Sequence, residues 1–194
     1  KAGYKDINDL IKSGKKVKSG DKVYASFMGK SIALFNIGNK PIEDGMNILG
    51  AHIDSPRLDI KQNPLYEEKE LAYLDTHYYG GIKKYQWTAM PLALHGCIIT
   101  GEGKSIDICI GEDENDPVFC ITDLLPHLGA EQNERKLSEG IKGEELNVLI
   151  GSDTVEEEDV KEAVKLNTLI LLNQKYGITE RDFTRAEIEV VPAA

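Results

Sequence analysis

The sequence has 194 residues, of which 41% are hydrophobic and 29% charged, and its formal net charge is −10. This balance is typical of a globular chain that can bury a core, and it argues against disorder over the whole length. The acidic charge lacks the basic footprint of a nucleic-acid-binding protein. No stretch approaches the roughly 20 apolar residues of a membrane span. We therefore expect neither nucleic acid nor a membrane among its partners.

The three cysteines, Cys97, Cys109 and Cys120, are widely spaced and form no CxxC pair. This argues against a zinc site built from cysteines. Cys109 and Cys120 lie among apolar residues, where a thiol behaves as a small hydrophobic group. Together with the absence of a signal-peptide pattern, this predicts a reduced, cytoplasmic protein.

The first third of the chain predicts a short helix at 4–11 and a hairpin of two strands at 22–28 and 31–37, turning at Gly29-Lys30. Residues 46–51 form a nearly continuous apolar run, which is typical of a strand buried on both faces. This predicted strand leads into His52 and Asp54 and stops at Ser55-Pro56.

The middle of the chain has the period-two pattern of β-strands. In 71–77, Leu71, Tyr73, Asp75 and His77 alternate with Ala72, Leu74 and Thr76, so each set lies on one face of a strand. Residues 95–99 and 105–110 predict a strand pair, and 118–122 a further strand. The pattern at 124–137 favours a helix.

The clearest predicted helix spans 154–176. Asp153 or Thr154 can cap it, and Gly177 can end it. The helix dipole favours the acidic residues of the first turn, which are Glu156, Glu157, Glu158 and Asp159. A strand at 186–191 follows, and a strand at the very end of a sequence suggests a truncated chain. Strands with one long helix predict a mixed α/β or α+β arrangement, with a soft domain boundary near 63–64.

His52 is the histidine best placed for chemistry. The carboxyl end of a strand points toward the ligand crevice of an α/β sheet, so His52 can present a ring nitrogen to a metal. Asp54, two positions later, can accept the other ring N–H and fix the tautomer. The alternative is a histidine that caps the strand end through an ordinary hydrogen bond.

Three tracts resemble motifs of the M18 aminopeptidases, in the family's order and at about its spacings. His52-Ile53-Asp54-Ser55-Pro56 resembles the His-x-Asp-Ser-Pro signature, and 75–82 resembles the Tyr-Gly-Gly segment. Pro126-His127-Leu128 resembles the Pro-His-Leu segment. The continuation at 83–87 is similar to the branch related to aminopeptidase I.

The resemblance implies a zinc-dependent aminopeptidase that releases N-terminal amino acids from peptides and holds two Zn²⁺ per active site. It implies an α/β fold, part of a zinc-exopeptidase α/β/α sandwich with an inserted β-rich dimerisation domain. Residues 1–64 would be the N-terminal part of the catalytic α/β domain, 65–185 the inserted domain, and 186–194 the truncated return to the catalytic domain. The inserted domain would support dimers and dodecamers.

The resemblance also implies residue roles. His52 would be a zinc ligand, and Asp54 the carboxylate behind it. His127 would be a zinc or substrate ligand that reaches an active site, that of a dimer partner. In some family members a second histidine follows four residues later, where this chain has Glu131, so which histidine has the role stays open. Packing of His127 under its loop is the alternative.

The resemblance implies an incomplete site as well. The family's remaining metal ligands and its glutamate general base are absent from these 194 residues, so we expect the chain alone to be inactive. Two other readings stay open: a non-catalytic oligomerisation module, and an unrelated small-ligand-binding domain. His77 predicts cross-strand packing, and no function is assigned to His95.

Overall fold

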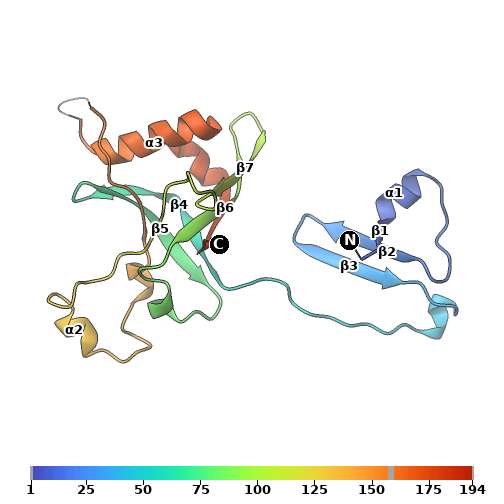
Figure 1. Ribbon diagram of the computed structural model, residues 1–194. Coiled ribbons are helices and arrows are strands. Elements are labelled where there is room, and N and C mark those ends of the chain that lie inside the picture. The colour runs from blue at the N-terminus through green and yellow to red at the C-terminus, as the bar shows by residue number, and fades with distance from the viewer. Residues whose placement is uncertain (1, 157–159, 194) are drawn as a thin grey trace. The chain divides into compact units, whose positions relative to one another are not determined.

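The computed structural model describes residues 2–156 and 160–193 (Figure 1). The chain divides into two compact units, Lys1–Asp54 and Ser55–Ala194, which are described separately here as unit 1 and unit 2. The helices and strands of unit 1 are β1 (Lys5–Asp6), α1 (Ile7–Lys12), β2 (Lys22–Phe27), β3 (Ser31–Asn36) and a 3₁₀ turn at Ile42–Asp44. Those of unit 2 are β4 (Arg57–Glu68), β5 (Leu71–Tyr79), β6 (Leu92–Ile99), β7 (Ser105–Ile110), α2 (Ala130–Asn133), β8 (Val148–Gly151), α3 (Ala163–Tyr176) and β9 (Ala186–Pro192), with 3₁₀ turns at Lys84–Gln86, Gly143–Glu145 and Glu180–Arg185.

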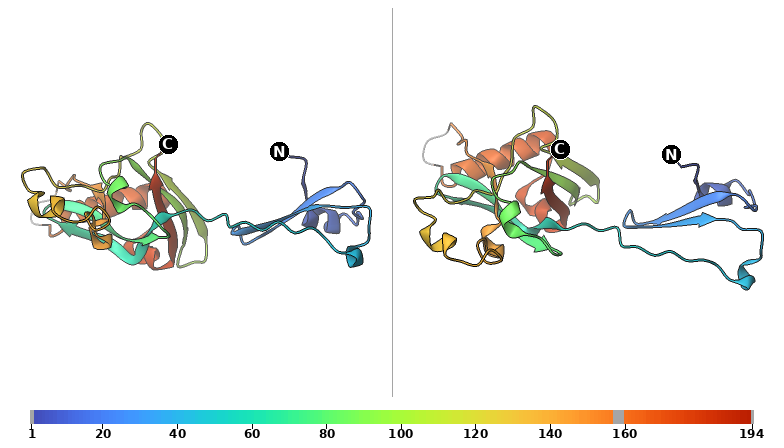
Figure 2. Two further views of the ribbon diagram at one scale, coloured as in Figure 1. Left: turned by 90° about the horizontal axis from the view of Figure 1, so that it is seen from below. Right: turned by 60° about the horizontal axis from the view of Figure 1, so that its bottom comes forward.

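Unit 1 is a three-stranded sheet in the order β1-β2-β3. β2 and β3 form the predicted antiparallel hairpin, and Figure 2 shows them as a long pair of strands with α1 beside them. Met28 and Gly29 turn the chain with positive φ angles of 52° and 68°. The predicted helix begins later than expected, at Ile7, because β1 pairs with β2 first and the Asp6 side chain then caps the backbone N–H of Asn8 at 2.8 Å.

The predicted buried strand at 46–51 is wrong for this structure. In the described parts of the chain no strand pairs with residues 46–54, and they form neither helix nor strand. Leu49 is fully exposed at 100%, and Ile48 is 79% exposed. A strand buried on both faces needs neighbouring strands and covering helices, and the small sheet of unit 1 provides none for this segment.

Unit 2 is built on a six-stranded sheet in the order β7-β6-β9-β4-β5-β8. The predicted strand pair β6–β7 is confirmed, with His95 opposite Cys109. The alternation predicted for β5 is confirmed too, because Ala72, Leu74 and Thr76 are at most 3% exposed while the other face of the strand is more open.

The core of unit 2 lies between one face of the sheet and α3, which packs over β4, β5 and β8 (Figure 1). Gly177 ends α3 in the left-handed conformation, as predicted, with a φ of 68°. The predicted start at 154 is wrong: α3 begins at Ala163, because Glu162 before it has a left-handed backbone with a φ of 54°. Of the predicted acidic first turn, Glu157, Glu158 and Asp159 lie outside the described residues.

The segment 118–137 is less regular than predicted. Residues 119–121 make isolated bridges to Leu92, Leu149 and Thr88 instead of a full strand. The predicted helix at 124–137 is reduced to the four residues of α2. Pro126 has no N–H to donate to a helix, and the Asp123 side chain accepts instead from the backbone of Leu124 at 2.8 Å.

Gly96 allows two central strands to approach closely. Its φ is 153°, and a Cβ atom there would overlap the carbonyl oxygen of Glu187 and lie 2.8 Å from the Cα of Ile188 in β9. Only glycine fits this position without displacing β9.

The compact units and the expected domains divide the chain at different places. Unit 2 begins at Ser55, so the expected boundary at 64/65 falls inside β4. The final strand β9 lies between β4 and β6 in the sheet of unit 2. The assignment of 1–64, 65–185 and 186–194 to domains of a larger enzyme stays a prediction.

Candidate functional site

His52 and Asp54 lie together at the end of unit 1. The His52 Nδ1 is 3.3 Å from Asp54 Oδ1, and the two side chains are 86% and 50% exposed. In the tautomer that carries its proton on Nδ1, the ring has a lone pair on Nε2 that can bind a metal. The pair therefore has the geometry expected of a ligand and its orienting carboxylate, although the segment that carries it is an extended loop and not a strand end.

His127 lies in unit 2, in the exposed turn at 126–128. The turn is braced from within: Asp123 Oδ1 accepts from the Gln132 side chain at 3.0 Å, and the backbone N–H of Leu128 donates to Leu125 at 2.8 Å. Around the histidine, Leu124, Leu125 and Leu128 are 54%, 66% and 69% exposed. His127 is thus presented to the outside on a fixed, apolar turn and does not pack under its loop.

The other two histidines have partners within unit 2. His77 stacks on Tyr78 with ring centroids 5.5 Å apart and lies opposite Asp59 in the neighbouring strand. The His95 Nε2 is 2.7 Å from Glu112 Oε1, a contact that joins β6 to the loop after β7. No local pattern in the sequence predicts this pair, because 17 positions separate the two residues.

Arg57 is a further residue that the sequence did not single out. Its Nε lies 2.8 Å from Asp59 and 2.9 Å from Glu189, and its guanidinium group lies 4.3 Å from the ring centre of Tyr79. Burial acts to lower the pKa of Arg57, but the hydrogen bond to Asp59 and the charges of Asp59 and Glu189 outweigh it and raise that pKa above its usual value. Arg57 is therefore a fixed cation.

Contacts around Arg57 bring together two of the tracts that resemble family motifs, His52–Pro56 and 75–82. Arg57 is opposite Tyr79 in the β4–β5 register. Gly80, with a positive φ of 76°, faces Pro56, and a Cβ added to it would lie 3.6 Å from that ring. The Ser55-Pro56 end of the first tract is therefore held against the Tyr79-Gly80 end of the second.

The fit of these residues to zinc is partial. A catalytic zinc ion takes three protein ligands and keeps one open position. Within residues 2–156 and 160–193, no three His, Cys, Asp or Glu side chains are grouped so that they could hold a metal ion. His52 and Asp54 by themselves therefore fall short of a complete zinc site. In the same ranges, no helix is both long and apolar enough for a membrane span.

The match to a known family covers the whole chain. The family model described as Aminopeptidase I zinc metalloprotease (M18) matches residues 1–194, and the chain belongs to this family. A probable M18 family aminopeptidase 1 of Clostridium acetobutylicum is 55% identical over 193 residues, which is 100% of this chain and 42% of the relative. The protein of the same description in Thermotoga maritima is 52% identical over 171 residues, or 88% of this chain and 37% of the relative. The chain thus spans about two fifths of the length of these relatives.

Solved structures agree with the family. Aminopeptidase I from Clostridium acetobutylicum superimposes with a TM-score of 0.88 at 51% identity, covering 100% of this chain and 42% of that one. The fold is the mixed, sheet-rich α/β fold of M18 aminopeptidases. The S. cerevisiae mApe1 dodecamer has a TM-score of 0.58 at 16% identity, covering 98% and 41% of the two chains, and at that distance it shows the fold alone.

Proposed function

We propose that this chain is part of a zinc-dependent aminopeptidase that releases N-terminal amino acids from peptides. The observation that carries the proposal is the family match over residues 1–194, together with the His52–Asp54 pair in a ligand-and-orienter geometry. The relatives described as M18 aminopeptidases support the peptidase activity.

In this proposal His52 would bind one of two zinc ions through Nε2, and Asp54 would hold the ring by accepting a hydrogen bond from its Nδ1–H. A bound zinc ion would act as a Lewis acid and would lower the pKa of a water bound to it. Asp54 is a positioning residue: it fixes the tautomer and makes the imidazole a stronger ligand.

The rest of the site would come from parts of the protein outside these 194 residues. A pair of zinc ions needs further ligands and a general base, and the described residues of this chain offer one edge only. We therefore expect the 194-residue chain alone to be inactive.

We further propose that unit 1 belongs to the catalytic domain and that residues 65–185 of unit 2 are the inserted domain that mediates self-association. For unit 1, the supporting observation is that β3 exposes apolar side chains on both of its faces, among them Ile32, Leu34 and Phe35. In the longer enzyme, other layers of the catalytic domain would cover these side chains. For unit 2, the exposed leucines around His127 favour a contact with a second copy. His127 would then reach the active site of that copy, in a dimer or a dodecamer, in a cytoplasmic enzyme.

A non-catalytic oligomerisation module is the second candidate, and the self-contained sheet of unit 2 favours it. The two candidate functions differ in the role of His52, which binds zinc in the aminopeptidase and has no catalytic role in the module. In the longer protein, His52→Ala is expected to lower the hydrolysis of aminoacyl p-nitroanilides about a hundredfold or more, and Asp54→Asn about 10- to 100-fold. The matched control is His77→Ala, another exposed histidine, which should leave the rate within about twofold. An unchanged rate in His52→Ala would remove His52 from the site and favour the module.

A further inference from the structure

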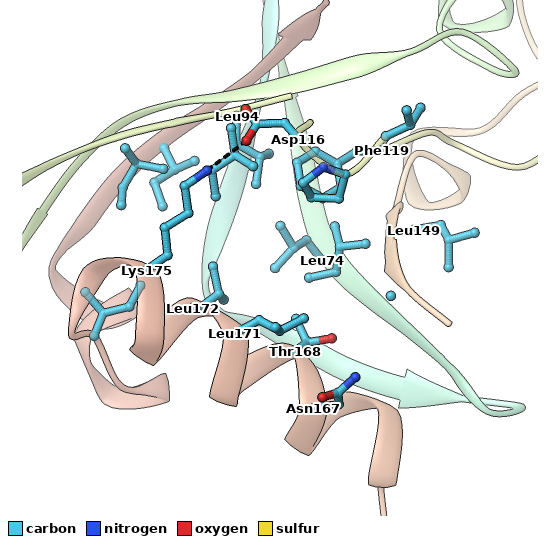
Figure 3. Close-up of a pocket in the computed structure, with 18 of the residues that line it drawn as sticks. Leu74, Leu94, Asp116, Phe119, Leu149, Asn167, Thr168, Leu171, Leu172 and Lys175 are labelled. Carbon is cyan, nitrogen blue, oxygen red and sulfur yellow. Dashed lines mark hydrogen bonds and ion pairs between the residues drawn. The ribbon is translucent and has the colours of Figure 1, made fainter. Parts of the chain in front are cut away.

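A cavity of about 640 Å³ lies between α3 and the sheet of unit 2 (Figure 3). Its inner wall is apolar, with Leu74, Leu94 and Phe119 on the sheet side. Two more apolar lining residues, Val118 and Leu171, are 75% and 57% exposed and form its mouth. Small-molecule sites in proteins typically measure about 300–1,000 Å³ and are mostly apolar. The hollow therefore has the size and lining of a binding site.

One end of the cavity is closed by an ion pair. Figure 3 shows Lys175 reaching from α3 to Asp116, and the Nζ–Oδ1 distance is 2.8 Å. The other oxygen of Asp116 accepts from the backbone N–H of Gly111, also at 2.8 Å. The bonds from Lys175 and Gly111 hold the pKa of Asp116 at about 2. These two charges neutralise one another, so neither needs a charged ligand.

The opposite end of the cavity is negative. Asn167 lies roughly 12 Å from Lys175 along α3, and its side chain donates to the backbone carbonyl of Asp153 at 3.0 Å. Asp153 also lines the cavity, and with Asp116 paired it gives the lining a net negative charge. The surroundings have the same sign: residues 55–194 carry 27 acidic against 14 basic residues, a net charge of −13. A positive ligand is therefore favoured over a negative one.

We propose that this cavity binds a small apolar amine. The apolar body lies between α3 and the sheet, past Val118 and Leu171, and the ammonium group stays at the Asp153 end, where it keeps contact with water. Every residue that lines this cavity belongs to unit 2.

The test is calorimetric titration of the 194-residue chain with two probes that share one apolar body, octylammonium and 1-octanol, below the concentration at which octylammonium forms micelles. Octylammonium is expected to bind roughly two- to fivefold more tightly, the usual contribution of an exposed charge pair. Asp153→Asn should remove that difference. Asp107→Asn, at an exposed position on the other face of the sheet, should keep it.

The location of the site is tested by filling the mouth. Leu171→Trp should weaken octylammonium binding about tenfold or more, while Ile170→Trp, the neighbouring exposed position that does not line the cavity, should leave it unchanged. Val118→Trp, at the other exposed apolar lining residue, serves the same purpose if Leu171→Trp does not fold, as judged by circular dichroism. The proposal is overturned if octylammonium does not bind, if octanol binds as tightly, or if binding survives the filled mouth. None of these outcomes depends on peptidase activity.

Discussion

The two units of this chain differ in how completely they bury their own apolar side chains. Among the described residues of unit 1, Val23 alone is buried, and β3 is exposed along its whole length. Unit 2 encloses a continuous core between its sheet and α3. Unit 1 carries a net charge of +3, from nine lysines against six carboxylates, whereas unit 2 carries −13. A sheet without a core of its own needs other layers of secondary structure to cover its apolar side chains. The proposed zinc ligand, His52, lies in unit 1, the unit whose sheet is uncovered.

The largest expected effect tests this difference directly. Leu58→Ala in β4 removes a side chain with 0% exposure from the core of unit 2 and should destabilise that unit by about 2–5 kcal/mol. Leu34→Ala in β3 removes the same atoms from a 57% exposed position and should cost less than about 0.5 kcal/mol. Urea denaturation measures the free energy of unfolding of both variants. An equal loss of unfolding free energy in the two would mean that unit 1 has a core like that of unit 2.

The next effect concerns the tight approach of β6 and β9. Gly96→Ala places a methyl group against the backbone of Glu187, so either β9 shifts or the sheet opens, at a cost of about 1–3 kcal/mol. Gly101→Ala is the control, because the nearest atom to its added Cβ is the end of the flexible Arg185 side chain at 3.5 Å. Thermal unfolding measures both. A Gly96→Ala variant as stable as the control would contradict the observed packing of these strands.

A smaller effect depends on pH. The pKa of Asp116 is lowered from its ordinary value of 3.8 to about 2 by the hydrogen bonds from Lys175 and Gly111. Because the folded pKa lies below that of the unfolded chain, the ionised carboxylate stabilises unit 2 above the unfolded value, and this contribution is lost as the pH falls toward 2.

The corresponding measurement is the urea midpoint of Asp116→Asn against pH. The variant should be less stable than the parent chain at neutral pH, and the difference should shrink between about pH 4 and pH 2. Asp107→Asn, at an exposed position on β7, is the matched control for the loss of one carboxylate. A difference that stays constant down to pH 2 would contradict the assignment of the effect to the Asp116 carboxylate.

The sequence predicted what local patterns encode. The alternation in β5 reflects a sheet with one covered face, and Gly177 ends α3 because glycine adopts a left-handed backbone at no steric cost. The prediction failed at 46–51, because an apolar run becomes a buried strand only when distant segments cover it. The bond between Arg57 and Glu189 was missed for the same reason, since only the position of β9 beside β4 brings those two residues together.

For the candidate site, the sequence identified His52 and Asp54 through their spacing, and the structure places the two side chains together. It also singled out His127, whose exposed turn agrees with a role outside its own unit. The ligand role of each residue stays a prediction, because a metal site is a property of several chain segments and spacing within one segment describes only part of it.

The most direct test of this account is the amount of zinc that remains bound after dialysis, measured by elemental analysis. The 194-residue chain should retain much less than one zinc ion per chain, because His52 alone is a weak site, whereas the longer protein should retain two. His52→Ala in the longer protein should lower that number, and His77→Ala should leave it unchanged. Two tightly held zinc ions in the 194-residue chain would contradict the claim that it carries one edge of the site.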